Sequence, residues 1–234
     1  MTLPAVIFDL DGTLVDSEPH YFEAGRRLLA SHGVHDYTWE QHRRFIGIGT
    51  KETLEVLREE YGLSAPVQEL LDGKNRIYLE LARGATDVFP RMRAFVELLA
   101  KAGHPMAVAS GSSREAIRAV LAGTGLDVRL PTVVSAEEVE HGKPAPDVFL
   151  EAARRLGVDP ADCVVVEDAP PGAQAAHRAG MRCVAVPYLA AQADDPAFAT
   201  AGLLVRGGQD AFDARGVMDW LTARQTGGRA AGRD

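Results

Sequence analysis

The stretch Ala5-Val6-Ile7-Phe8-Asp9-Leu10-Asp11-Gly12-Thr13, close to the N-terminus, decides the fold. Its first four residues are apolar, as in a strand that is buried on both faces of a parallel sheet. Side chains two residues apart on an extended chain face the same way, so Asp9 and Asp11 can address one site at the end of this strand. Gly12 supplies a tight turn there. Two carboxylates this close repel each other unless a cation or a proton offsets their charge, which favours a site for Mg2+, a hard cation that prefers oxygen ligands.

The rest of the chain repeats the first half of this pattern. Short apolar runs alternate with amphipathic helical stretches, an order that is typical of a parallel α/β sheet. The further runs cover residues 106–109, 132–134, 163–166, 183–186 and, as an edge strand, 203–205. We therefore expect an α/β fold with a Rossmann-like, three-layer core built on a parallel sheet.

Two of the expected helices have readable ends. Ser112 precedes Glu115 by three residues, which is the spacing of a capping box, and the helix that it opens should stop near Gly123. A second helix over residues 146–156 should stop at Gly157, because glycine accepts the left-handed conformation in which many helices end.

Residues 16–86 interrupt the alternation, because they contain helical patterns at 18–31, 50–61 and 66–83 but no convincing strand. The chain leaves the sheet after its first strand and returns near residue 88. We therefore expect a catalytic core of residues 1–15 and 87–225, an inserted all-helical cap of residues 16–86, and a disordered tail at 226–234. The hinges of the cap should lie at 14–16 and 84–87.

The composition is that of an ordinary globular protein, with 46% hydrophobic and 25% charged residues. The net charge is −8 and no block of Lys or Arg occurs, which argues against nucleic acid as a partner. The two cysteines, Cys163 and Cys183, lie in apolar runs and are expected to be buried and unpaired. We see no signal-peptide pattern and no apolar run of about 20 residues, so we expect a cytoplasmic protein with no membrane partner, and a monomer as the simplest assembly.

Polar residues follow three of the expected strands, at the ends where parallel sheets bind ligands. Ser110 and Gly111 follow the strand at 106–109 and lead into a helix, whose first N–H groups favour an anion. Glu167 and Asp168 follow the strand at 163–166, and two more carboxylates in a closed site would need a metal. Lys143 lies in a loop just before a helix, where its ammonium can offset negative charge on a phosphate and on a nucleophile.

These residues fall into four motifs that resemble, in order and spacing, those of the haloacid-dehalogenase superfamily. The motifs are Asp9-Leu10-Asp11-Gly12-Thr13, Ser110, Lys143-Pro144-Ala145-Pro146-Asp147 and Glu167-Asp168 with Gly172. The resemblance covers residues 5–187. The place of the cap, between the first two motifs, is similar to that in the helical-cap subgroup, which includes β-phosphoglucomutase and sugar-phosphate phosphatases. One motif alone would be weak evidence, whereas four in register are specific.

The resemblance implies a role for each motif residue. Asp9 would attack phosphorus and form an aspartyl-phosphate, while Asp11 would protonate the leaving oxygen and then activate water. Mg2+ would be held by Asp9, Asp168 and the backbone carbonyl of Asp11, with Glu167 as a further ligand or a nearby group. The phosphoryl group would be bound by Ser110, Gly111 and Lys143, and Thr13 would donate to it or fix the loop.

The same resemblance implies substrate contacts from the cap. His20 lies where members of the β-phosphoglucomutase subgroup carry a histidine, and an exposed helix histidine is the alternative. The loop that holds Gly47, Thr50 and Lys51 touches the substrate in that subgroup. Lys74 matches a cap lysine of the subgroup, and a solvated lysine is the alternative.

A phosphatase that hydrolyses a small phosphorylated metabolite, such as a sugar phosphate, fits these motifs best. The alternative is a phosphosugar mutase resembling β-phosphoglucomutase, in which the cap loop supplies an arginine for the second phosphate of the substrate. Thr50 and Lys51 occupy the matching place here, and neither replaces a bidentate arginine. A phospho-acceptor module would have no use for the cap, and the dehalogenases of the superfamily lack an equivalent of Asp11. A hexose phosphate, a phosphogluconate and a nucleotide all stay open as substrates.

Overall fold

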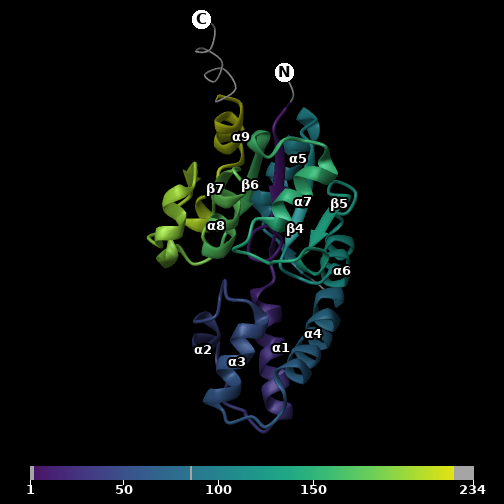
Figure 1. The fold of residues 1–234 in the computed structure, drawn as a ribbon, viewed down its shortest axis with the longest axis vertical. Helices are drawn as coiled ribbons and strands as arrows, with labels where there is room; N and C mark the ends of the chain where they lie inside the picture. The colour runs from purple at the N-terminus through teal and green to yellow at the C-terminus, as the bar shows by residue number, and fades with distance from the viewer. Residues whose placement is uncertain (1–2, 85, 224–234) are drawn as a thin grey trace, which may run out of the picture.

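The computed structural model describes residues 3–84 and 86–223, so the tail expected at 226–234 lies outside the described residues. Two lobes are stacked along the long axis of the molecule (Figure 1). The larger lobe holds the sheet and its flanking helices, and the smaller lobe holds helices α1 to α4. Within the described ranges, no helix combines the length and the apolar character that crossing a membrane requires.

A six-stranded parallel sheet forms the centre of the larger lobe, in the order β5-β4-β1-β6-β7-β8. β1 (Ala5–Phe8) pairs in parallel with β4 (Met106–Ser110) on one side and with β6 (Cys163–Glu167) on the other. The outer strands are β5 (Thr132–Ser135), β7 (Arg182–Ala185) and β8 (Leu203–Leu204). The expected α/β fold is confirmed. Because the strands are parallel, the carboxyl ends of β1, β4 and β6 meet at the edge of the sheet that faces the smaller lobe (Figure 1).

Helices cover both faces of the sheet and complete three layers (Figure 1). On one face, Val6 and Phe8 belong to the cluster formed with α5 (Pro90–Ala102), α6 (Arg114–Thr124) and α9 (Ala214–Ala223). On the other face, Ala5 and Ile7 pack with α7 (Asp147–Leu156) and α8 (Pro170–Arg178). Alternate residues of a strand point to opposite faces, so the all-apolar sequence of β1 follows from its central place. Both cysteines are buried and unpaired, as expected.

Four helices of the described chain form the smaller lobe around an apolar cluster of their own. They are α1 (Glu18–Ser31), α2 (Trp39–Arg43), α3 (Thr50–Glu60) and α4 (Val67–Gly84). Leu28, Leu54 and Leu70 bring α1, α3 and α4 together in this cluster. α2 was not predicted from the sequence, because its five residues are too few to show a helical period.

Two short strands join the lobes. β2 (Val15–Asp16) and β3 (Asp87–Val88) pair in an antiparallel manner where the chain leaves the larger lobe and where it returns. β2 falls within the expected hinge at 14–16, and β3 overlaps the expected hinge at 84–87 only at Asp87. The exact limits of the cap, 16 and 86, stay a prediction.

The start of α6 differs from the expected capping box by one residue. Ser113, not Ser112, caps the helix by accepting a hydrogen bond from the N–H of Ala116. The helix runs through Gly123 and ends before Gly125, which has the left-handed conformation. The expected box was wrong because the hydroxyl of Ser112 donates to the carboxylate of Asp11, which follows β1. α7 ends before Gly157, as predicted.

Candidate active site

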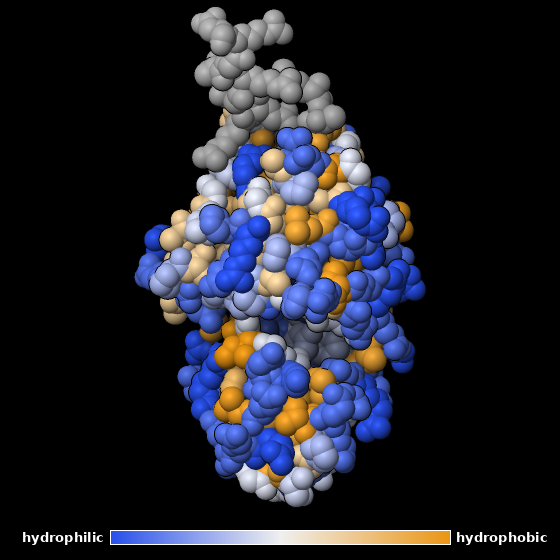
Figure 2. Space-filling view, viewed as in Figure 1, coloured by the Kyte–Doolittle hydropathy of each residue, from blue (hydrophilic) through white to orange (hydrophobic). Residues whose placement is uncertain are grey.

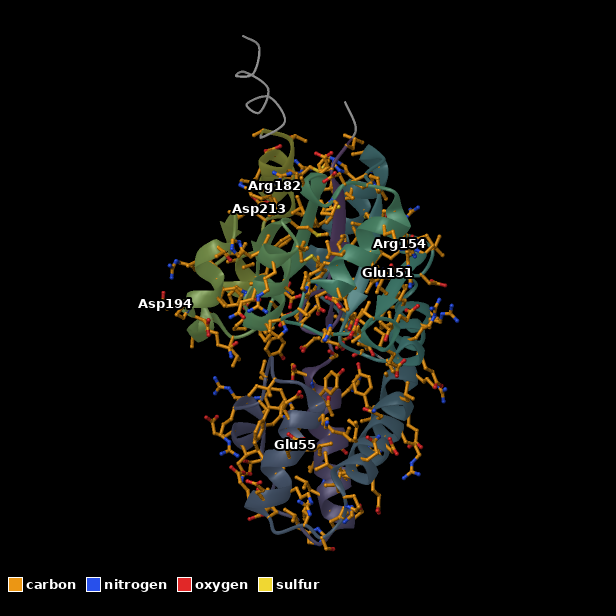
Figure 3. All side chains as sticks on the ribbon, in the orientation of Figure 1. Glu55, Glu151, Arg154, Arg182, Asp194 and Asp213 are labelled. Carbon is orange, nitrogen blue, oxygen red and sulfur yellow. The ribbon has the colours of Figure 1, made fainter. Side chains whose placement is uncertain are left out.

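A cavity of about 480 Å3 lies between the two lobes, at the carboxyl ends of β1, β4 and β6. Figure 2 shows the surface narrowed and hollowed where the lobes meet. Side chains of both lobes reach into the space between their ribbons (Figure 3). Nearly all of the residues predicted for the site are brought together here, although they come from parts of the chain more than 150 residues apart.

Lys143 joins two of the predicted carboxylates. Its Nζ lies 2.5 Å from Asp9 Oδ1 and 2.8 Å from Glu167 Oε2, and all three groups are nearly buried. Burial raises the pKa of Asp9 well above its usual range, and the charge of Glu167 adds to this, while Lys143 acts in the opposite direction. Burial alone would lower the pKa of Lys143, but the charges of Asp9 and Glu167 raise it, so the ammonium is kept. The arrangement places the carboxyl group of Asp9 beside a fixed cation.

A group that could hold a metal ion is formed by Asp9, Glu167 and Asp168, whose oxygens all lie within 4.8 Å of one another. The hydroxyl of Thr13 donates to Asp168 Oδ1 at 2.7 Å. Burial raises the pKa of Asp168 well above its usual range, and the charges of Glu167 and Asp9 raise it further. One ammonium cannot neutralise three buried carboxylates, and an all-oxygen donor set suits a hard divalent cation. The residues therefore fit the expected Mg2+.

The side chain of Asp11 does not belong to this group in the described chain, although it was expected to contribute its backbone carbonyl to the metal. That carbonyl contact stays a prediction. Thr13 was expected to bind the phosphoryl group or to fix the loop, and its buried hydroxyl is engaged with Asp168.

Two glycines leave the space that the carboxylates occupy. Gly12 has a φ of +79°, and a Cβ built on it would lie 2.4 Å from Asp168 Oδ2. A Cβ on Gly172, in the first turn of α8, would lie 2.0 Å from the carboxyl carbon of Glu167. Atoms cannot approach this closely, so a larger residue at either position would displace a carboxylate of the site. Both motif positions therefore require glycine for steric reasons.

Gln209 fixes the loop after β1 from a distant part of the chain. Its Nε2 donates to the carbonyl oxygens of Gly12, at 3.1 Å, and Thr13, at 3.0 Å. Gln209 was not predicted from the sequence, since no motif or periodicity links it to the first strand.

The carboxylate of Asp11 has different neighbours from that of Asp9. Its Oδ2 accepts hydrogen bonds from Ser112, at 2.6 Å, and from Ser110, at 3.2 Å. Its Oδ1 accepts from the hydroxyl of Tyr78, on cap helix α4, at 3.0 Å. The hydroxyl of Tyr21, on α1, lies 2.8 Å from Ser112 Oγ. Burial raises the pKa of both tyrosines, and the charge of Asp11 adds to this, so both keep their protons. Ser112, Tyr21 and Tyr78 were all missed by sequence analysis.

Ser110 and Gly111 line the cavity at the end of β4, as predicted. Ser110 is buried, and its hydroxyl oxygen accepts from the backbone N–H of Ser112 at 3.0 Å. This bond closes the loop that leads into α6.

The predicted cap residues Gly47, Thr50, Lys51 and Lys74 all line the cavity. Gly47 has a φ of +85°, and a Cβ on it would lie 3.4 Å from the Cβ of Ala169, in the loop between β6 and α8. The cap loop therefore packs against the core at the rim of the cavity.

Lys74 is not the solvated lysine considered as the alternative, because only 4% of its surface is exposed. Its ammonium lies 5.6 Å from the ring centre of Tyr21. Burial lowers its pKa to about 8, and Glu18 opposes this shift. In the part of the cap that the structure describes, Tyr21 lines the cavity, whereas its neighbour His20 does not. A helix turns by about 100° per residue, so adjacent side chains face different directions, and a substrate contact from His20 stays a prediction.

Glu18 and His42 form a second polar pair in the cap wall of the cavity. His42 Nε2 lies 2.8 Å from Glu18 Oε2, and both side chains are largely buried.

Comparison with known proteins gives a consistent result. The family model described as haloacid dehalogenase-like hydrolase matches residues 6–186. Fructose-1-phosphate phosphatase YqaB from Escherichia coli is 36% identical over 187 residues, which cover 79% of this chain and 96% of that protein. The bifunctional riboflavin kinase/FMN phosphatase of Arabidopsis thaliana is 34% identical over 191 residues, or 80% of this chain. This chain spans about half, 49%, of the length of that bifunctional relative.

The crystal structure of β-phosphoglucomutase (pgmB) from Clostridium difficile superposes with a TM-score of 0.78. The superposition covers 96% of this chain and 100% of that chain, at 24% sequence identity. The two proteins share the fold.

Proposed function

We propose, because the chain belongs to the haloacid dehalogenase-like hydrolase family, that this phosphoric monoester hydrolase is a Mg2+-dependent phosphatase. It releases phosphate from a small phosphorylated metabolite, in particular a sugar phosphate, through an aspartyl-phosphate at Asp9. The observation that carries the proposal is the contrast between two carboxylates only two residues apart. Asp9 touches the ammonium of Lys143, whereas Asp11 is surrounded by hydroxyl groups. Different surroundings give two neighbouring carboxyls different roles, here nucleophile and acid–base.

The first step of the proposed reaction is attack by a carboxylate oxygen of Asp9 on phosphorus. A bond forms between that oxygen and phosphorus as the bond to the leaving oxygen breaks, and Asp11 gives its proton to the leaving oxygen. Lys143 stays beside Asp9 and stabilises the charge on the phosphoryl oxygens, together with Ser110 and the backbone of Gly111. Asp9, Asp168 and the backbone carbonyl of Asp11 would hold Mg2+, with Glu167 as a further ligand or a nearby group, and the bound ion would supply further positive charge to the phosphoryl group.

The second step releases phosphate. Asp11, now ionised, takes a proton from a water molecule, and the water oxygen bonds to phosphorus as the Asp9–phosphorus bond breaks. Inorganic phosphate leaves and both aspartates regain their starting states. Asp11 lies on the cap side of the cavity, where the leaving group departs and where the water must take its place.

A sugar phosphate is the proposed substrate class for two reasons. The E. coli relative, covered over 96% of its length, is a fructose-1-phosphate phosphatase. The cap wall also offers the polar side chains of Glu18, His42 and Lys74, which suit a polyhydroxyl leaving group. An FMN-like substrate is the second candidate, because the plant relative includes an FMN phosphatase.

The mutase alternative finds less support in the cavity. A mutase must grip a second phosphate, for which a bidentate arginine is best suited. Among the described residues that line the cavity there is no arginine, and the cations are Lys51, Lys74 and Lys143. The proposed function is therefore the phosphatase, and its partner is a small metabolite. We also propose that the protein is a cytoplasmic monomer. Sedimentation equilibrium measures the molecular mass in solution and tests the monomer.

The experiment that tests the proposal is a phosphate-release assay over sugar phosphates, sugar acid phosphates and nucleotides including FMN, with Mg2+ and with EDTA. The Asp9→Asn variant should lose at least about a thousandfold in rate, because it removes the nucleophile. Asp194→Asn is the matched control, since Asp194 is an exposed carboxylate far from the cavity (Figure 3). Conversion of β-glucose 1-phosphate to its 6-phosphate isomer without phosphate release would support the mutase. Folded protein that does neither would remove the proposal.

A further inference from the structure

Side chains of both lobes bind the carboxylate of Asp11. The core contributes Ser110 and Ser112, which donate to Oδ2, and the cap contributes Tyr78, which donates to Oδ1. Since Ser112 donates to Asp11, its oxygen accepts from the hydroxyl of Tyr21, 2.8 Å away. Two cap tyrosines are therefore hydrogen-bonded to the carboxylate of Asp11, Tyr78 directly and Tyr21 through Ser112. None of the steps of the proposed reaction uses either tyrosine.

The two tyrosines are held firmly in place. Their rings stack with centres 4.3 Å apart and planes 21° from parallel. Tyr78 is only 4% exposed, and it packs in the apolar cluster that includes Leu14 and Ala24. A hydroxyl on a ring packed in this way is a donor at a fixed point.

The terminal torsion of an aspartate is broad, so a carboxyl group needs hydrogen bonds to keep one orientation. Tyr78 fixes Oδ1 on the cap side. Oδ2 then lies beside Ser110, the residue that binds the phosphoryl group in the proposed reaction. The hydroxyl of Ser110 can rotate toward the phosphate when the substrate arrives. Oδ2 is then the oxygen of Asp11 that meets the leaving group.

We propose that Tyr78 is a positioning residue that aims the Asp11 carboxyl group at the leaving oxygen, and that it does so only when the cap is docked on the core. Tyr21 acts in the same way through Ser112. This inference rests on the proposed function. It makes proton transfer to the leaving group conditional on closure of the cap, so that a phosphate ester is cleaved efficiently only inside the closed cavity.

The test compares two substrates that differ in their need for a proton. p-Nitrophenyl phosphate releases a stable phenolate, whereas fructose 1-phosphate releases an alkoxide that must be protonated. The measured quantity is kcat/KM, because it covers the steps up to departure of the leaving group and excludes hydrolysis of the aspartyl-phosphate. For Tyr78→Phe we expect kcat/KM on fructose 1-phosphate to fall about tenfold or more, as positioned acid–base groups contribute 10²–10⁴-fold. On p-nitrophenyl phosphate it should change by less than about threefold.

The control is Tyr61→Phe, which makes the same change in the cap at a tyrosine bonded to Gln41, away from Asp11. It should leave both kcat/KM values as in the wild type, and thermal unfolding checks that each variant is folded. Tyr21→Phe should show the same preference as Tyr78→Phe with a smaller loss. An equal loss on both substrates, or no loss on either, overturns the inference. If the wild type hydrolyses neither substrate with Mg2+ and no other phosphate ester, the proposed function itself fails, which is a different result.

Discussion

At the residue scale, the buried carboxylates of Asp9 and Glu167 share the ammonium of Lys143, and the carboxylate of Asp168 lies beside them. Charges removed from water are costly unless opposite charge is near, so the folded protein without a metal carries an electrostatic penalty in this cluster. A divalent cation that binds the folded chain and not the unfolded chain removes this penalty. The stability of the protein should therefore depend on Mg2+ even when no substrate is present.

We predict that saturating Mg2+ raises the melting temperature. A ligand at one hundred times its Kd adds about 2.7 kcal/mol to the free energy of unfolding, which for a chain of this size is on the order of 5–10 °C. Differential scanning calorimetry with Mg2+ and with EDTA measures the shift. Asp168→Asn should lose most of it, whereas Asp194→Asn, a change in an exposed carboxylate paired with Arg206, should keep it. An equal shift in both variants would rule out the carboxylate cluster as the metal site.

Lys74 leads to a second prediction at the residue scale, on the dependence of stability on pH. Burial lowers its pKa to about 8, while Glu18 opposes the shift and the ring of Tyr21 faces the ammonium. Between about pH 8 and the usual lysine pKa, the unfolded chain binds the proton and the folded chain does not, so stability gains from rising pH. Below pH 8 both states are charged, and the buried ammonium costs about 3 kcal/mol by the same linkage.

Lys74→Met should therefore be more stable than the wild type at pH 7, and this advantage should shrink as the pH rises from 8 to 10.5. Urea unfolding of the two proteins at several pH values measures the difference in unfolding free energy. Lys101→Met, at an exposed lysine of α5, controls for the loss of one positive charge. A constant difference over the whole range would contradict the assigned cause.

At the element scale, α8 begins directly after the carboxylates of β6, and its first turn must leave room for Glu167. Gly172→Ala would place a Cβ 2.0 Å from the carboxyl carbon of Glu167, so the carboxylate must move away from Lys143 and the metal site. We expect phosphate release to fall about tenfold or more and the Mg2+ concentration for half-maximal rate to rise, since ligand placement governs metal affinity. The fold should persist, because alanine favours the helix.

The matched control for this change is Gly123→Ala in α6. The nearest atom to a Cβ there is the carbonyl oxygen of Ala82, at 3.9 Å, so the methyl group has room. That variant should be as active as the wild type and equally or slightly more stable, by up to about 1 kcal/mol. Comparable loss of activity in both variants would show that the effect comes from the helix backbone and not from Glu167.

The elements also show what the sequence can and cannot predict. The strands of the core and the polar residues grouped at their ends could be predicted because β1, β4 and β6 are short apolar runs followed by polar residues, whereas the catalytic roles of those residues stay a prediction. α2 was missed because it is short. Ser112 was assigned to a helix cap because local spacing cannot tell that its hydroxyl meets Asp11, which lies 101 residues earlier. Gln209 and Tyr78 were missed for the same reason, since their partners are set by tertiary packing alone.

At the scale of the whole molecule, the contacts across the cavity connect a cap and a core that must separate. The cap loop at Gly47 lies against Ala169, Tyr78 binds Asp11, and the hydroxyl of Tyr188 in the core donates to Asp16 at the hinge. The cavity is lined from both lobes, and we expect that a substrate reaches Asp9 when the cap loop moves away from the core. We expect the cap to turn about the antiparallel pair of β2 and β3, where the chain passes between the lobes. A gate of this kind is expected to limit turnover through substrate admission and product release.

A disulfide across the rim should lock this gate. The Cβ atoms of residues 47 and 169 would lie 3.4 Å apart, close to the 3.5–4.5 Å that a disulfide usually spans, so the double variant Gly47→Cys, Ala169→Cys should cross-link on oxidation. Phosphate release should fall about tenfold or more in the oxidised protein and recover on reduction with dithiothreitol, because the locked cap cannot admit substrate. The native cysteines are buried and do not compete.

Gly47→Cys alone is the necessary control, because residue 47 has a φ of +85° and a side chain there is strained. Its activity sets the reference, and it should not respond to oxidation. Small-angle scattering of the oxidised double variant should match the compact two-lobed shape in Figure 1. Full turnover by the oxidised, cross-linked protein would mean that substrate reaches Asp9 without movement of the cap. The hydrogen bond from Tyr78 to Asp11 would then not depend on closure of the cap, and Tyr78 would orient Asp11 at all times.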